Sequence, residues 1–212
     1  GSHAPPRNRK LGSILLKLAD IFGRSDLKTA NNEGGPIFGS TIWRPRVLSR
    51  HNVGFAVCRA WRTDAKASDL RALKDLKRDI GRAGLNVLVS DLTRATEFLF
   101  GAGMFAQVTH VACGHSQRPD CLSCRLAAGV AVALGLPHVK AFDDRFVMGS
   151  SHPKENMKLP PLVIRGQLDQ IATLVIDDVV TSGFHMHEAL TALRSALVPA
   201  AGIAWIGGVI RS

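Results

Sequence analysis

Cysteine is scarce in this chain, and long apolar runs are absent. The 212 residues include four cysteines, which are too few for a disulfide scaffold of this length. We therefore expect a reducing, cytoplasmic setting. No apolar run approaches the roughly 20 residues that a membrane-spanning helix needs, and the first residues lack the pattern of a secretory signal. With 46% hydrophobic and 21% charged residues, the composition favours a folded globular protein.

Acidic residues are also scarce, but only in the first part of the chain. Residues 1–80 hold 16 lysines and arginines against 7 acidic residues, whereas residues 81–212 hold 11 against 10. Such an uneven surplus favours contact with nucleic acid, an acidic protein partner or a lipid surface. A solvated surface that only keeps the protein soluble is the equal alternative.

Aromatic and basic residues alternate within this basic part. Arginines interleaved with Trp43 and Trp61 can contact phosphates and stack on bases; they are Arg44, Arg46, Arg50, Arg59 and Arg62. Tryptophans are, however, more often anchors of a core. A basic helix face follows, carrying Arg71, Lys74, Lys77, Arg78 and Arg82, and it suits either a salt-bridged surface or a nucleic-acid surface.

Hydrophobic periodicity predicts strands and helices that alternate along the chain. We expect strands at 53–61, 85–92, 108–113 and 174–176, and helices at 11–23, 67–83, 93–102, 122–134 and directly after Gly183. Gly84 is expected to end the helix at 67–83, and residues 25–40 and 142–161 are expected to be irregular. The alternation predicts an α/β fold with a mostly parallel central sheet flanked by helices. Residues 1–40 form a basic arm with a short helix, and residues 41–212 form the domain.

The most specific motif is TLVIDDVVTSG at 173–183. A short β-branched run predicts a buried strand that leads directly into Asp177 and Asp178. The turn of Thr181, Ser182 and Gly183 then opens an amphipathic helix. A turn of small residues at a helix start binds anions, because backbone N–H groups and the helix dipole favour phosphate there. The two carboxylates suit sugar hydroxyls or a magnesium ion.

This motif resembles the phosphoribosyl-pyrophosphate signature of the type I phosphoribosyltransferases, and its DDVVTSG form is closest to the ComF-like and orotate-type pattern. The resemblance implies that Asp177 and Asp178 hold the ribose hydroxyls and that Thr181, Ser182 and Gly183 hold the 5-phosphate, with Mg²⁺ as cofactor. An ordinary strand-to-helix turn with incidental aspartates is the alternative.

Two positions depart from the family pattern. The 6-oxopurine enzymes have an aspartate where this chain has Thr181. Family members commonly have threonine as a phosphate ligand where this chain has His185. A histidine can donate a hydrogen bond to phosphate, but the same change also fits a pocket that has lost its substrate.

The resemblance extends, less specifically, to two loops. The loop after the strand at 108–113 implies pyrophosphate contacts from Gly114 and Arg118. The irregular segment 142–161 corresponds to a flexible loop that closes over the reacting centre, with contacts from His152, Lys154 and Lys158. A solvated loop is the alternative for that segment.

Cysteine and histidine also cluster in the first of these loops. The spacing C-x-H-x5-C-x2-C suits tetrahedral zinc, with the ligands Cys113, His115, Cys121 and Cys124. A single C-x2-C pair is weak support. Alternatively, Cys113 ends a buried strand and Cys124 faces the core.

Two functions follow from these features. One is transfer of a phosphoribosyl group from phosphoribosyl pyrophosphate to a base or amine, with no general base assigned. The other is a non-catalytic member of the fold, a regulator or inhibitor that uses its basic N-terminal half on nucleic acid or a protein partner. The resemblance also implies a homodimer as an oligomeric state to test.

Overall fold

The computed structural model describes residues 35–64, 67–112, 120–145 and 160–210. Ten helices and strands are assigned within these residues. In chain order they are α3 (Gly35–Ser40), β1 (Thr41–Arg50), β2 (Val53–Trp61), α4 (Ala67–Arg78), α5 (Arg82–Phe100), β3 (Gln107–His110), α6 (Leu122–Leu134), β4 (Thr173–Val180), α7 (Phe184–Ser195) and β5 (Ala200–Val209).

Five strands form one sheet in the order β1-β2-β5-β4-β3. Strands β2, β5, β4 and β3 are parallel, and β1 joins β2 as an antiparallel hairpin. The hairpin turn consists of His51 and Asn52, with φ of 51° and 62°, the left-handed pair that a two-residue hairpin turn requires. The predicted α/β class with a mostly parallel sheet is confirmed.

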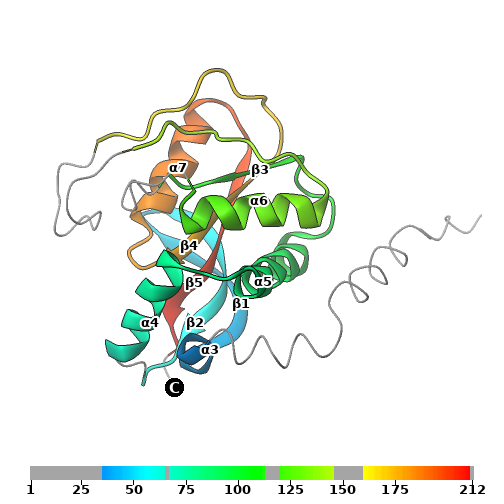
Figure 1. Cartoon of the computed structure of the whole chain (residues 1–212). Coiled ribbons are helices and arrows are strands. Elements are labelled where there is room, and N and C mark those ends of the chain that lie inside the picture. The colour runs from blue at the N-terminus through cyan, green and yellow to red at the C-terminus, as the bar shows by residue number, and fades with distance from the viewer. Residues whose placement is uncertain (1–34, 65–66, 113–119, 146–159, 211–212) are drawn as a thin grey trace, which may run out of the picture.

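Helices cover both faces of the sheet (Figure 1). Helices α5 and α6 pack against each other over one face, where Leu88 and Leu126 meet Leu174 and Ile176 of β4. Helix α7 covers the other face, where Met186 packs with Val175. Because β4 lies between β5 and β3 and is covered on both faces, its apolar run is fully buried, as expected for a central parallel strand.

Several predicted elements are confirmed. The predicted strand 53–61 coincides with β2 and the predicted helix 122–134 with α6. The helix predicted at 67–83 begins as expected but ends at Arg78. The strand and helix of the TLVIDDVVTSG motif are β4 and α7. The helix expected at 11–23 lies outside the described residues.

The predicted strand 85–92 is wrong, because these residues lie inside the 19-residue helix α5. Leu88, Leu92 and Ala95 are buried at helical spacing, so the 3.6-residue period of the whole segment outweighs the short apolar run. The prediction that Gly84 ends the preceding helix is also wrong. That helix, α4, ends at Arg78, and Gly84 lies in the first turn of α5.

The prediction that residues 25–40 form a loop fails for residues 35–40, which form α3. Ile37 of α3 is buried in the same core cluster as Leu88 and Leu126. The packed domain therefore includes residues that precede position 41. Within the described part of the chain, no helix is both long and apolar enough to cross a membrane.

The separation between α7 and the sheet depends on Gly202 of β5. A Cβ atom at this position would overlap the Met186 sulfur, and Met186 is fully buried. We expect Gly202→Ala to lower the free energy of unfolding by about 1–3 kcal/mol through overpacking, measured by urea denaturation.

Gly39→Ala is the matched control, because a Cβ at Gly39 meets nothing within 4 Å. This change in α3 should leave the free energy of unfolding unchanged or raise it by up to about 1 kcal/mol. Equal stability of the two variants would contradict the close packing of α7 on β5.

Candidate functional site

The two acidic residues of the motif lie near the end of β4 and are held differently. Asp177 is 7% exposed; its Oδ1 accepts hydrogen bonds from Ser123 Oγ at 3.1 Å and from the Asp178 backbone N–H at 2.8 Å. Asp178 forms an ion pair with Lys77 of α4, whose Nζ lies 2.9 Å from Oδ2 and 3.0 Å from Oδ1. The pair therefore connects β4 to α6 on one side and to α4 on the other.

Two adjacent carboxylates in a partly dehydrated site repel each other. Burial, with a further contribution from the Asp178 charge, raises the pKa of Asp177 to about 7, although Lys77 acts in the opposite direction. Near neutral pH the proton of Asp177 is therefore easily displaced, beside the ion pair of Asp178 with Lys77. A cation or a hydroxyl donor that binds beside these carboxylates therefore changes the protonation of Asp177.

The turn after β4 is tightly packed. Gly183 has φ of 83° and is the N-cap of α7. A Cβ on Gly183 would lie 2.7 Å from Arg50 Cβ, so only glycine fits both the backbone and the space. The Ser182 hydroxyl accepts a 3.3 Å hydrogen bond from the Phe184 N–H. The predicted turn at the start of a helix is thus present, with the exposed Arg50 beside it.

A buried arginine organises the neighbouring part of the site. The Arg145 side chain is 3% exposed and pairs with Glu188 of α7 at 2.8 Å. It also donates to the carbonyls of Ala112, after β3, and Pro160, while the Leu162 N–H donates to Glu188. The Arg145–Glu188 pair thus connects α7 to the residue after β3 and to the segments that precede and follow residues 146–159.

His185 belongs to this network. Its Nδ1 lies 3.2 Å from Arg145 Nη2. Because a guanidinium only donates, Nδ1 is the acceptor in this contact. Burial acts to raise the pKa of Glu188, but the neighbouring His185 and Arg145 lower it overall. His185 thus belongs to the Arg145–Glu188 network and lies two residues after the glycine turn.

Several predicted site residues lie outside the described part of the chain. They are the pyrophosphate-loop residues Gly114 and Arg118, the flexible-loop residues His152, Lys154 and Lys158, and the zinc ligands Cys113 and His115. The other two predicted zinc ligands are described. Cys121 is the N-cap of α6, Cys124 lies in its first turn, and both are buried.

The basic residues predicted to bind nucleic acid are held in different ways. Arg59 makes an ion pair with Asp91 at 3.1 Å, and Trp61 belongs to the core. Arg62 pairs with Asp64 at the surface. Arg50 instead lies beside the Gly183 turn. Arg50 and Arg145 were missed as site residues because both are brought there by contacts between segments far apart in the sequence.

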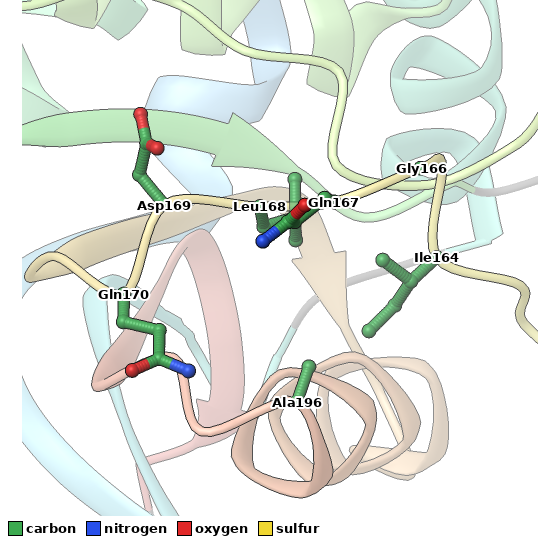
Figure 2. Close-up of a pocket in the computed structure, with 7 residues that line it drawn as sticks. All are labelled: Ile164, Gly166, Gln167, Leu168, Asp169, Gln170 and Ala196. Atoms are coloured by element: carbon green, nitrogen blue, oxygen red, sulfur yellow. The ribbon is translucent and has the colours of Figure 1, made fainter.

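A separate hollow of about 650 Å³ lies at the other end of α7. Figure 2 shows Ala196, just after α7, facing the segment from Ile164 to Gln170 that precedes β4. Its lining includes one carboxylate, Asp169, and no cationic side chain. This hollow therefore suits phosphate poorly and is distinct from the acidic pair and the glycine turn.

Comparison with known proteins shows similarity of fold. No protein-family model matches the chain, and no curated protein matches its sequence. Orotate phosphoribosyltransferase from Aeropyrum pernix matches at 17% identity over 86% of this chain and 81% of that one, with a TM-score of 0.41. Adenine phosphoribosyltransferase from Leishmania donovani matches at 13% identity over 82% and 79%, with a TM-score of 0.40.

The raised pKa of Asp177 predicts how stability depends on pH. The folded state holds the Asp177 proton more tightly than the unfolded chain, so this stabilisation is complete at acidic pH and is lost as pH rises through about 7. We expect the free energy of unfolding to fall between about pH 4 and 7 by at most about 1.4 kcal/mol per pH unit from this group, and to level off at higher pH.

Urea denaturation across this range tests that prediction. Asp177→Asn retains an acceptor for Ser123 but has no titrating proton, so its stability should vary less with pH than that of the wild type. The exposed Asp64→Asn should follow the wild-type slope. A stability difference between wild type and Asp177→Asn that is the same at every pH would contradict the raised pKa.

The Arg145–Glu188 pair predicts a large effect on stability. Glu188→Gln leaves a buried guanidinium without its counter-charge, so we expect a loss of about 3 kcal/mol in the free energy of unfolding. Asp143→Asn breaks an exposed pair with Arg165 and should cost less than about 1 kcal/mol. Similar losses for the two variants, measured by urea denaturation, would show that the Arg145 network does not anchor α7.

Proposed function

We propose that this protein binds a phosphorylated ribose, with phosphoribosyl pyrophosphate as the ligand that fits best. The observation that carries this proposal is the juxtaposition of Asp177 and Asp178 with the left-handed Gly183 that opens α7. One end of this arrangement provides carboxylates for hydroxyls, and the other provides N–H groups for phosphate.

The two carboxylates take different roles in this proposal. Asp178 has 13% of its side chain exposed, and it is the acceptor for the ribose 2- and 3-hydroxyls. Asp177 lies deeper and acts as a positioning residue, because it accepts the Asp178 backbone N–H. Lys77 already donates a hydrogen bond to the Asp178 carboxylate. A bound ribose must therefore either bind this carboxylate together with Lys77 or displace the Lys77 ammonium.

The 5-phosphate contacts the turn and its neighbours. Backbone N–H groups of the turn at Thr181, Ser182 and Gly183 would donate to it, because the α7 dipole favours an anion at the helix start. Arg50 lies against Gly183 and adds a positive charge beside the turn. His185, in the first turn of α7, lies beside Arg145 and adds an imidazole near the same helix start.

The acidic pair also fits the magnesium ion that the family resemblance implies. Carboxylate oxygens are the ligands that Mg²⁺ prefers, and the displaceable proton of Asp177 leaves a second carboxylate available to a cation. Asp177 and Asp178 would hold the ion, directly or through water. When bound, it would neutralise charge on a departing pyrophosphate.

This arrangement supports phosphoribosyl transfer to a base or amine. In that reaction the bond between ribose C1 and pyrophosphate breaks while a bond from C1 to the nucleophile forms, and Asp178 orients the ribose. Binding without transfer is the second candidate. It is favoured by the engagement of His185 with Arg145, which gives this residue a structural role where the family commonly has threonine.

Calorimetry with phosphoribosyl pyrophosphate and Mg²⁺ tests the proposal. We expect saturable binding by the wild type and a loss of about 10–100-fold in affinity for Asp178→Asn, since a hydrogen bond to a charged group contributes about 1.5–3 kcal/mol. Asp169→Asn, in the hollow at the other end of α7, should bind as the wild type does.

Absence of binding by the wild type would overturn the proposal, as would equal affinity of wild type and Asp178→Asn. Release of pyrophosphate in the presence of candidate bases and amines separates the two forms of the proposal. Release that requires an acceptor supports transfer, whereas binding without release supports the non-catalytic form.

A further inference from the structure

Three metal-binding side chains from separate segments converge beside α6. They are His110, the last residue of β3, Cys124 in the first turn of α6, and His138, which follows α6. One ligand atom from each residue lies within 4.8 Å of the others. His110 Nδ1 and His138 Nε2 are 3.3 Å apart.

The fold itself brings these residues together. The segment after α6 lies parallel to β3, since Val108 pairs with His138 and the Val139 N–H donates to the Val108 carbonyl at 2.9 Å. This pairing sets the two histidines on neighbouring extended segments. Helix α6 packs against β3 and β4. Its first turn brings Cys124 close to the two histidines. His110 and Cys124 are each 8% exposed.

The separation of the two histidine nitrogens fits a tetrahedral ion. Zinc binds imidazole nitrogen at about 2.0–2.1 Å, so two nitrogens on one tetrahedral zinc lie about 3.3–3.4 Å apart. The observed 3.3 Å between the histidine nitrogens already has this value. A thiolate with two imidazoles suits zinc, whereas Mg²⁺ and Ca²⁺ prefer oxygen ligands.

We propose that His110, Cys124 and His138 form a binding site for zinc or a similar divalent transition metal, with a fourth position taken by water or an exogenous ligand. This ligand set differs from the cysteine-rich set predicted from the C-x-H-x5-C-x2-C spacing and shares only Cys124 with it. It does not depend on the ribose-phosphate site. The two sites are nevertheless neighbours, because Ser123, next to Cys124, donates to Asp177.

Cobalt provides a direct probe of the site. The full chain, stripped of metal with a chelator, is titrated with Co²⁺ alone. We expect one Co²⁺ per chain, with the intense visible bands of tetrahedral cobalt and a near-ultraviolet cobalt–thiolate band. His138→Gln and Cys124→Ser should each weaken binding tenfold or more, since even loss of a residue that only orients a ligand costs about 10–100-fold.

Cys121→Ser is the matched control, because Cys121 is also a buried cysteine at the start of α6 but does not belong to the cluster. It should retain both bands. Absence of tetrahedral bands in the wild type would overturn the proposal, as would retention of wild-type binding by His138→Gln. Loss of binding in Cys121→Ser, with His138→Gln unaffected, would overturn it in favour of the cysteine-rich set.

X-ray absorption at the zinc edge of the wild-type protein gives a second measurement that does not depend on the variants folding. One sulfur and two imidazole nitrogens are expected in the first coordination sphere. Two or more sulfurs, or none, would overturn the assignment.

Discussion

The surrounding structure has to compensate two neighbouring carboxylates near the end of a buried strand. Asp177 and Asp178 cannot both be charged and isolated in such a place. Lys77 compensates the charge of Asp178, and Ser123 donates to Asp177, whose pKa is raised. The partners come from α4 and α6, so compensating these charges also ties both helices to β4.

A second ion pair determines how α7 presents its first turn. Arg145 and Glu188 are held together with backbone groups of Ala112, Pro160 and Leu162. The start of α7 is thus fixed on one side by this network and on the other by the close contact of Gly183 with Arg50. In the proposed function, a helix start held in this way would bind a ligand that carries both hydroxyls and phosphate at little ordering cost.

The sequence predicted what depends on local pattern. The strand and helix of TLVIDDVVTSG and the helix 122–134 are present, because period, turn residues and length agree there. The predicted strand at 85–92 was wrong, because a short apolar run fits both the helical and the strand period. The period of the whole segment 82–100 is helical, and these residues form α5. Arg50, Lys77 and Arg145 were not predictable as site residues, because Lys77 reaches Asp178 across 101 positions. The cysteine spacing predicted a zinc site with His115, whereas the cluster in the proposed metal site takes its histidines from positions 110 and 138.

The most direct test of the ribose-phosphate site removes the ligand hydroxyl that Asp178 is proposed to hold. Calorimetry compares ribose 5-phosphate with 2-deoxyribose 5-phosphate, each with wild type and with Asp178→Asn. The account predicts that the wild type prefers the ribose compound by about tenfold or more and that the variant shows little preference. Equal affinity of the wild type for the two ligands, or the same preference in both proteins, would contradict it.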